Sequence, residues 1–222
     1  MKDELVIYNR PKSNISEDIR TIRTNLQFTS NIDESKVLLI TSSVPGEGKS
    51  FISSNLAAAF AGTGETTLLI DSDLRLGRVH KIFGLSNKKG LSNLLVEKDV
   101  IDCQDYIKKT EIENLYVMTR GTVPPNPSEL LNSSNAKIIT EFLKTKFDHI
   151  IFDGVPINGL PDSLIVAGYV DKVIIVSSAG YTKIDELNDT KKALEKIDAN
   201  IAGVVVNRTS KTKRGKYSNY YE

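Results

Sequence analysis

The chain has 222 residues, of which 40% are hydrophobic and 26% are charged, and its formal net charge is +1 at pH 7. This composition predicts one soluble α/β domain with a full core, and the near-neutral charge argues against nucleic acid as a partner. The single cysteine, Cys103, excludes an internal disulfide. No apolar run approaches the ~20 residues that span a bilayer, and the first residues do not form a secretory signal. We therefore expect a cytoplasmic protein that reaches a membrane only through a partner.

The first predicted element is an N-terminal helix over residues 14–28. Asn14 and Glu17 have the spacing of a capping box, with Asn14 as the N-cap residue. An apolar stripe is expected on one side of this helix, formed by Ile15, Ile19, Ile22 and Leu26. Glu17, Arg20 and Arg23 lie on its flank, which predicts either a solvated charged face or an interface with another protein.

An apolar strand over residues 37–40 leads into the octapeptide SVPGEGKS, residues 43–50, and a helix-compatible segment follows. Strand, glycine-containing loop and helix in this order predict a phosphate-binding loop, although the strict motif begins with glycine where this chain has Ser43. The backbone N–H groups of such a loop and the helix N-terminus bind phosphate. We expect Lys49 to reach the β- and γ-phosphates and the Ser50 hydroxyl to bind Mg²⁺. The predicted nucleotide-binding residues are Pro45, Gly46, Glu47, Gly48, Lys49, Ser50 and Phe51.

Two further predicted strands, over residues 67–70 and 149–152, end in aspartates. Asp71 and Asp73 follow the first strand, and Asp153 follows the second. An aspartate in this place often only caps a helix or starts a turn. Three of them beside a phosphate loop favour a metal site, because Mg²⁺ binds a few carboxylates together with phosphate oxygens. Ser50, Asp73 and Asp153 are the predicted metal ligands, and Asp71 remains as a base for a hydroxyl proton.

Apolar runs over residues 115–118, 173–176 and 201–206 complete the predicted sheet. Because these strands alternate with helix-period segments, we predict an α/β fold with a mostly parallel sheet flanked by helices on both faces, the P-loop NTPase fold. Ligands of such folds bind at the carboxyl ends of the strands, where the phosphate loop and the aspartates converge. We expect residues 1–207 to form one domain and residues 208–222 a flexible tail that is basic at first.

Two other segments are distinctive. The run GTVPPNPSELL, residues 121–131, is rich in proline, and its part up to Pro127 is predicted to be an extended loop and not a helix. The chain ends in YSNYYE, residues 217–222, which contains three of the eight tyrosines. A tail this polar does not bury tyrosines, so the sequence predicts a disordered end, a docking peptide or a cluster of phosphoacceptors.

These residues together resemble the bacterial tyrosine kinases of capsular and exopolysaccharide synthesis, in the Gram-positive type whose kinase is a separate cytoplasmic subunit. The phosphate loop, the run Asp71–Arg75 and the strand end at Asp153 are similar to the Walker A, Walker A′ and Walker B elements of that family. Residues 121–131 are similar to a stretch that its members carry. The likeness extends from about Pro11 to the terminal tyrosines. One departure is Gly154-Val155-Pro156, where the family commonly has Thr-Pro-Pro.

The resemblance implies a protein-tyrosine kinase that uses ATP and Mg²⁺ and regulates polysaccharide synthesis and export. In that role Lys49 would stabilise the transferred phosphoryl group and Asp71 would be the base for the tyrosine hydroxyl. The metal would be held by Ser50, Asp73 and Asp153. The phosphoacceptors implied are Tyr217, Tyr220 and Tyr221, autophosphorylated between subunits of a homo-oligomeric ring. The family's oligomerisation motif corresponds to Glu17, Arg20 and Arg23.

The implied partners are a transmembrane activator, which recruits the kinase to the inner face of the membrane, and protein substrates of the polysaccharide pathway. Two alternatives remain open. A nucleotide-driven ATPase switch of the partition and cell-division type would carry an additional lysine near the start of the loop, where this chain has Val44. A non-catalytic scaffold would not need the complete set of Lys49, Ser50 and aspartates.

Overall fold

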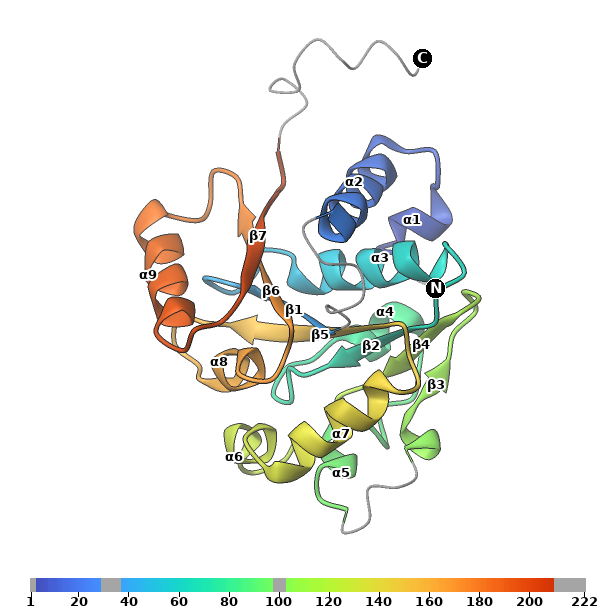
Figure 1. Ribbon diagram of the computed structural model, residues 1–222. Coiled ribbons are helices and arrows are strands. Elements are labelled where there is room, and N and C mark those ends of the chain that lie inside the picture. The colour runs from blue at the N-terminus through green and yellow to red at the C-terminus, as the bar shows by residue number, and fades with distance from the viewer. Residues whose placement is uncertain (1–2, 29–36, 98–102, 210–222) are drawn as a thin grey trace.

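The computed structural model describes residues 3–28, 37–97 and 103–209. Within these ranges seven strands form one sheet, in the order β3-β4-β2-β5-β1-β6-β7 (Figure 1). All neighbouring strands pair in parallel except β3 and β4, which confirms the predicted mostly parallel sheet. The strands are β1 (Val37–Ser42), β2 (Thr67–Asp71), β3 (Lys108–Lys109), β4 (Leu115–Met118), β5 (His149–Pro156), β6 (Lys172–Ser178) and β7 (Ile201–Asn207).

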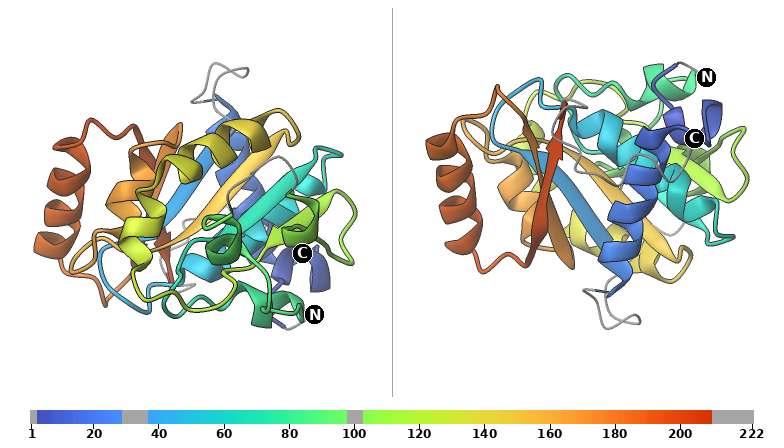
Figure 2. Two further views of the ribbon diagram at one scale, coloured as in Figure 1. Left: turned by 90° about the horizontal axis from the view of Figure 1, so that it is seen from below. Right: turned by 90° about the horizontal axis from the view of Figure 1, so that it is seen from above.

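Helices cover both faces of this sheet, as the two views of Figure 2 show. One face carries α1 (Val6–Asn9), α2 (Asn14–Phe28), α3 (Lys49–Ala61) and α4 (Val79–Phe83). The other carries α5 (Leu91–Leu94), α6 (Pro127–Leu131), α7 (Ser134–Lys144), α8 (Asp162–Ala167) and α9 (Ile184–Glu195). A short 3-10 helix, Gln104–Tyr106, precedes β3. The layered arrangement is the one that alternating strands and helices predict.

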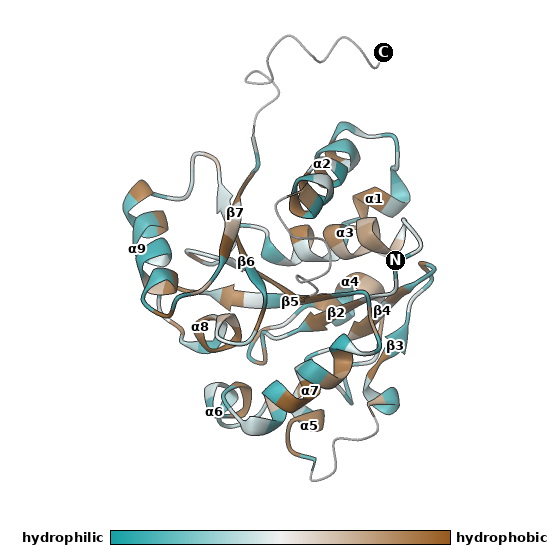
Figure 3. Ribbon diagram, viewed as in Figure 1, coloured by the Kyte–Doolittle hydropathy of each residue, from teal (hydrophilic) through white to brown (hydrophobic). Residues whose placement is uncertain are grey.

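The sheet divides the hydrophobic core into two halves. In β1, Leu38 and Ile40 belong to the half beneath α2 and α3, and Val37 and Leu39 belong to the opposite half. This alternation follows from the two-residue period of a strand. Every residue of β1, β2 and β6 is buried, as expected for parallel strands covered on both sides. Figure 3 shows the apolar sheet between helices whose outer surfaces, on α9 above all, are hydrophilic.

Helix α3 forms the rigid platform beneath the phosphate loop. All of its residues from Ile52 to Ala61 are buried, and several are alanines. Small side chains let the helix lie close to the sheet on one side and to α2 on the other, with which it has extensive contact. Because Lys49 is the first residue of α3, the position of the lysine is set by a helix that cannot move without disturbing the core.

Three local predictions were wrong. Ser13, not Asn14, caps α2, since its Oγ accepts a hydrogen bond from the Ser16 N–H at 3.3 Å and Asn14 is already helical. Ile15 is exposed, so the apolar stripe of this helix begins at Ile19. Pro127 begins α6, because a proline needs no N–H in the first turn of a helix.

Candidate active site

The loop between β1 and α3 has a backbone shape that requires glycine at two positions. Gly46 has φ 81° and Gly48 has φ 98°, in the left-handed region that side chains disfavour. A Cβ on Gly48 would also lie 2.2 Å from the side-chain amide nitrogen, Nδ2, of Asn207. The loop therefore has the conformation, next to a helix N-terminus, of an oxyanion-binding cradle.

Side chains from distant parts of the chain hold this loop in place. The buried Glu47 carboxylate accepts hydrogen bonds from the Val44 N–H, at 2.8 Å, and from the Thr182 hydroxyl. Asn207 donates to the Glu47 carbonyl at 2.9 Å, and Arg208 donates to the Gly46 carbonyl at 2.8 Å. Glu47, predicted to bind nucleotide, thus uses its side chain to shape the loop.

A cavity of about 730 Å³ opens beside the loop. The predicted nucleotide-binding residues all line it except Glu47, and Asp73 lines it as well. Three arginines, Arg75, Arg78 and Arg208, also line the cavity. No sequence motif had predicted a binding role for Arg75 or Arg78. A concave space with a lysine and several arginines around a glycine loop suits a polyphosphate ligand.

Asp71 is the last residue of β2, and Asp73 lies in the loop that follows. Asp153 lies inside β5, which continues to Pro156, so the predicted strand end before Asp153 was wrong. Asp71 and Asp153 are register partners on these adjacent strands, and both are buried. Asp153 accepts hydrogen bonds from the Ser53 hydroxyl, at 3.0 Å, and from Ser50. Asp73 is half-buried in the loop after β2, and its Oδ1 accepts hydrogen bonds from the backbone of that loop. The structure therefore brings the predicted metal ligands Ser50, Asp73 and Asp153 to one place.

Asp71 is placed differently from Ser50 and Asp73, and in this it is similar to Asp153. It is fully buried and does not line the cavity, and its Oδ2 accepts a hydrogen bond from the Val79 N–H at 3.1 Å. A Cβ on Gly77 would lie 2.4 Å from Asp71 Oδ1, so the loop after β2 packs directly over this carboxyl. Its Oδ1 has no hydrogen-bond partner. Its role as a base stays a prediction.

The electrostatics of the site favour a bound cation. Burial raises the pKa of Asp153 to about 6, against the hydrogen bond from Ser50 and the charge of Lys49. Burial also raises the pKa of Asp71 well above its ordinary value, and the charges of Asp153 and Asp73 raise it further. Burial lowers the pKa of Lys49, which the nearby carboxylates oppose. A divalent ion would relieve this repulsion between carboxylates.

The donor set fits a metal that is shared with phosphates. Among the residues that the structure describes, no group of three or more His, Cys, Asp or Glu side chains is arranged to hold a metal ion by itself. Mg²⁺ usually takes one or two carboxylates and completes its shell with water and phosphate oxygens. Ser50, Asp153 and Asp73 beside an oxyanion cradle match that preference.

Comparisons with known proteins identify the family. A family model described as AAA domain matches residues 35–205. The putative tyrosine-protein kinase CapB of Staphylococcus aureus is 40% identical over 98% of this chain and 94% of its own length. Tyrosine-protein kinase YwqD of Bacillus subtilis is 36% identical over 99% of this chain and 92% of its own. The chain belongs to the bacterial tyrosine kinases.

The solved structures agree with this family. The chimerical protein CapA2B2 superposes with a TM-score of 0.89 at 38% identity, over 95% of this chain and 92% of that one. The predicted fold and the predicted relationship to the tyrosine kinases of capsular and exopolysaccharide synthesis are thereby confirmed.

The tyrosine kinase has a structural reason for glycine at the position where its sequence departs from the family pattern. A Cβ on Gly154 would lie 2.5 Å from the Ser163 Oγ and 2.8 Å from a methyl group of Leu39. Ser163 is buried, and its hydroxyl accepts from the Val155 N–H and donates to the Val155 carbonyl. The space that a threonine would need at position 154 is therefore taken by Ser163.

The three predicted oligomerisation residues make contacts within the chain. Glu17 pairs with Arg20, which also donates to the Pro11 carbonyl at 2.7 Å. Arg23 donates to the Ala59 carbonyl at 2.8 Å and so connects α2 with α3. These contacts neither require nor oppose a neighbouring subunit, so the interface stays a prediction.

The remaining predictions concern the tail and the membrane. Tyr217, Tyr220 and Tyr221 lie outside the described residues, so their role as phosphoacceptors stays a prediction. In the described parts of the chain, no helix has both the length and the apolar character needed to cross a bilayer.

Proposed function

We propose that this chain is an ATP-dependent protein-tyrosine kinase that autophosphorylates Tyr217, Tyr220 and Tyr221 between subunits and regulates capsular or exopolysaccharide synthesis and export. The observation that supports this most is that Lys49, Ser50 and Asp73 line one cavity beside the glycine loop, and that the buried Asp153 lies close enough for its charge to act on Lys49. Phosphoryl transfer needs mainly positioning and neutralisation of charge, and this set of residues supplies both.

Each residue has a role that its position suits. The loop amides and Lys49 would bind the phosphates of ATP, and Ser50, Asp153 and Asp73 would hold Mg²⁺. When bound, Mg²⁺ supplies positive charge that offsets the charge on the transferred group. Asp71 would accept the proton of the tyrosine hydroxyl. Because it is buried beneath the loop after β2, that role requires the loop to expose the carboxyl when substrate binds.

Assembly and membrane recruitment form the second part of the proposal. Residues 1–207 would form the kinase domain and residues 208–222 a flexible tail. Copies would form a ring through Glu17, Arg20 and Arg23, and a transmembrane activator would bring the kinase to the inner face of the membrane. The structurally similar CapA2B2 is a chimerical protein, which supports the idea that a kinase of this type works with a segment of a second protein.

Intact-mass spectrometry of the purified protein, with and without Mg-ATP, tests the proposed activity. We expect phosphate groups to be added to the wild type, and Lys49→Met to lower the rate roughly 100-fold or more, because a positive charge at the transferred group is lost. Lys137→Met is the matched control, since Lys137 is exposed on α7 away from the cavity.

The same incubation with Mg-ATP distinguishes the kinase from the alternative function, an ATPase switch. Inorganic phosphate released by the wild type would be measured in the same samples. If phosphate were released but the mass of the protein did not increase, the nucleotide-driven ATPase switch would replace the kinase as the proposed function.

A further inference from the structure

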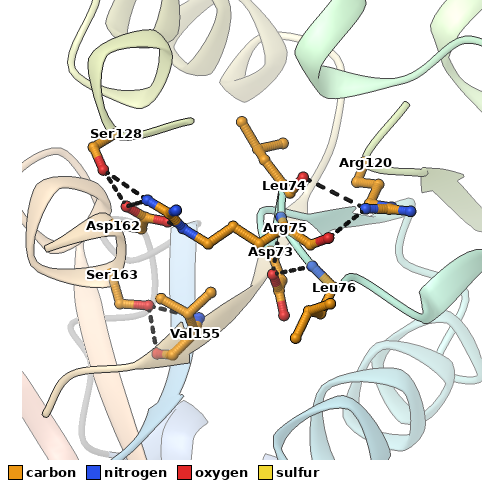
Figure 4. A network of polar contacts seen from close by, with 9 residues as sticks. All are labelled: Asp73, Leu74, Arg75, Leu76, Arg120, Ser128, Val155, Asp162 and Ser163. Carbon is orange, nitrogen blue, oxygen red and sulfur yellow. Dashed lines mark hydrogen bonds and ion pairs between the residues drawn. The ribbon is translucent and has the colours of Figure 1, made fainter. Parts of the chain in front are cut away.

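The loop that carries Asp73, residues 72–78, is joined to helix α8 by a partly buried ion pair (Figure 4). Arg75 Nε donates to Asp162 Oδ2 at 2.8 Å, and Arg75 Nη2 donates to Asp162 Oδ1 at 3.2 Å. The side chain of Asp162 is 1% exposed, whereas that of Arg75 is 36% exposed and reaches the cavity. A two-point arginine–carboxylate pair fixes orientation as well as distance.

Ser128 is the third member of this network. Its hydroxyl donates to Asp162 Oδ1 at 2.5 Å and accepts from Arg75 Nη2 at 3.1 Å. Ser128 lies in the first turn of α6, within the proline-rich run 121–131. That run therefore contacts the site through Asp162, although none of its own residues lines the cavity.

The main chain of the same loop is held from the opposite side. Arg120, which follows β4, donates from Nη1 to the Arg75 carbonyl at 2.7 Å (Figure 4). Asp73 Oδ1 in turn accepts from the N–H groups of Arg75 and Leu76, at 3.1 and 2.8 Å. The direction of the Asp73 carboxylate thus depends on the position of Arg75, and that position depends on Asp162.

The residue after Asp162 performs the same task for the other strand end. Ser163 exchanges two hydrogen bonds with Val155, at 2.8 and 2.7 Å, and Val155 lies two residues beyond Asp153 on β5. We call Asp162 and Ser163 the α8 clasp. The clasp contacts the two chain segments that carry the carboxylate candidates for the metal, Asp73 and Asp153. The phosphate loop, which leads to Ser50, is held by a separate group of residues, Glu47, Thr182 and Asn207.

We propose that Asp162 is a positioning residue for the nucleotide-bound divalent cation. It orients Asp73 through Arg75, and with Ser163 it fixes Asp73 relative to Asp153. The inference rests on the proposed function, because it assigns a role in the binding of Mg-nucleotide. It predicts a specific defect: loss of the clasp weakens the contribution of Mg²⁺ to nucleotide binding and leaves binding of the metal-free nucleotide unchanged.

Titration calorimetry with ADP, in Mg²⁺ and in EDTA, tests this on the full chain. We define the Mg²⁺ gain as the ratio of the ADP affinity in Mg²⁺ to that in EDTA. For Asp162→Asn we expect this gain to fall roughly 10-fold, as for other residues that orient metal ligands. The affinity in EDTA should stay within about twofold, since the phosphate loop is held elsewhere. Ser128→Ala removes one hydrogen bond to Asp162 and should lower the gain about threefold.

A double variant separates positioning from stability. Asp162→Asn alone leaves Arg75 without its buried partner, whereas Arg75→Gln with Asp162→Asn removes both charges and should have a melting temperature closer to that of the wild type. The double variant should still show the weakened Mg²⁺ gain. Asp105→Asn, which breaks an exposed pair with Lys89 at 2.9 Å, is the control and should leave ADP binding unchanged.

Two results would overturn the inference. One is a Mg²⁺ gain within twofold of the wild type in Asp162→Asn and in the double variant. The other is a loss of affinity in Asp162→Asn, which keeps Arg75, that is as large in EDTA as in Mg²⁺; the clasp would then be a purely structural feature. If the wild type itself bound no ADP in either buffer, the proposed function would fail, and this inference with it.

Discussion

Asp71 and Asp153 face an unfavourable environment in the protein without nucleotide. They are paired in register on adjacent strands, which lie about 4.8 Å apart, and both are buried. Burying two carboxyl groups together is costly unless protons or a cation neutralise them. The residues that suit the site for a divalent ion therefore lower the stability of the protein when that ion is absent, as is common at active sites.

The pH dependence of stability tests this cost. The pKa of Asp153 is raised from 3.8 to about 6, so the folded state holds this proton more tightly than the unfolded chain. The resulting stabilisation is complete below pH 3.8 and is lost as the pH rises through about 6. We expect Asp153→Asn to increase the free energy of unfolding in urea by roughly 1 to 2 kcal/mol more at pH 8 than at pH 5.

Ser53→Ala is the matched control for this measurement. It removes a hydroxyl that donates to Asp153 but keeps the titrating carboxyl group, so the pH dependence should persist. An equal effect of Asp153→Asn at both pH values would contradict the raised pKa.

Individual residues of the site were predictable to the extent that short motifs determine them. Lys49, Ser50 and the two glycines of the loop line the cavity, and their spacing alone places them at a strand-to-helix junction. The burial of Asp71 was not predictable, since it depends on how residues 72–78 fold over it. The pair Arg75–Asp162 was out of reach because its members are 87 residues apart and no local pattern connects them.

Elements were predictable where apolar periodicity is strong. The strands from β1 to β7 were anticipated except β3, whose two lysines carry no apolar signal. Errors occurred at element ends, where a single hydrogen bond decides the boundary. The cap of α2 is an example, because Ser13 and Asn14 are both good N-cap residues and only tertiary contacts select the first. One such contact is the Ser16 hydroxyl, which donates to the Arg10 carbonyl at 2.7 Å.

Helix α2 is the element on which the predicted assembly depends. We expect Arg20→Ala combined with Arg23→Ala to give smaller particles than the wild type in light scattering, because a ring contact through paired arginines and carboxylates would be lost. Arg23→Ala also removes the hydrogen bond from Arg23 to the Ala59 carbonyl, which connects α2 with α3, so a smaller particle could reflect a less stable fold. The melting temperature must therefore be measured alongside the mass.

Lys12→Ala provides the control for this double variant, because Lys12 is exposed just before α2. An unchanged particle mass in the double variant, with the fold intact, would reject α2 as an interface.

At the scale of the whole molecule, the site and the end of β7 lie at the same edge of the sheet. The phosphate loop follows β1, the carboxylates follow β2 and lie in β5, and β7 ends at Asn207 beside the loop. This common edge was predictable from the rule that parallel strands present their carboxyl ends together. The contacts of Asn207 and Arg208 with the loop were not, because they depend on which strand forms the edge of the sheet.

Transfer between subunits can be tested by mixing two inactive proteins. One carries Tyr217→Phe, Tyr220→Phe and Tyr221→Phe and retains the site, and the other carries Lys49→Met and retains the tyrosines. We expect neither to label itself and the Lys49→Met protein to gain phosphate when the two are mixed with Mg-ATP, as mass spectrometry would show. Labelling of the Phe variant at the wild-type level would move the acceptor elsewhere in the chain.

The anchoring of β7 to the phosphate loop has a mechanical consequence. Asn207 and Arg208 donate hydrogen bonds to two consecutive carbonyl groups of that loop, at the point where the described part of the chain ends. A pull on the chain beyond Arg208 would therefore act first on the backbone of the glycine loop.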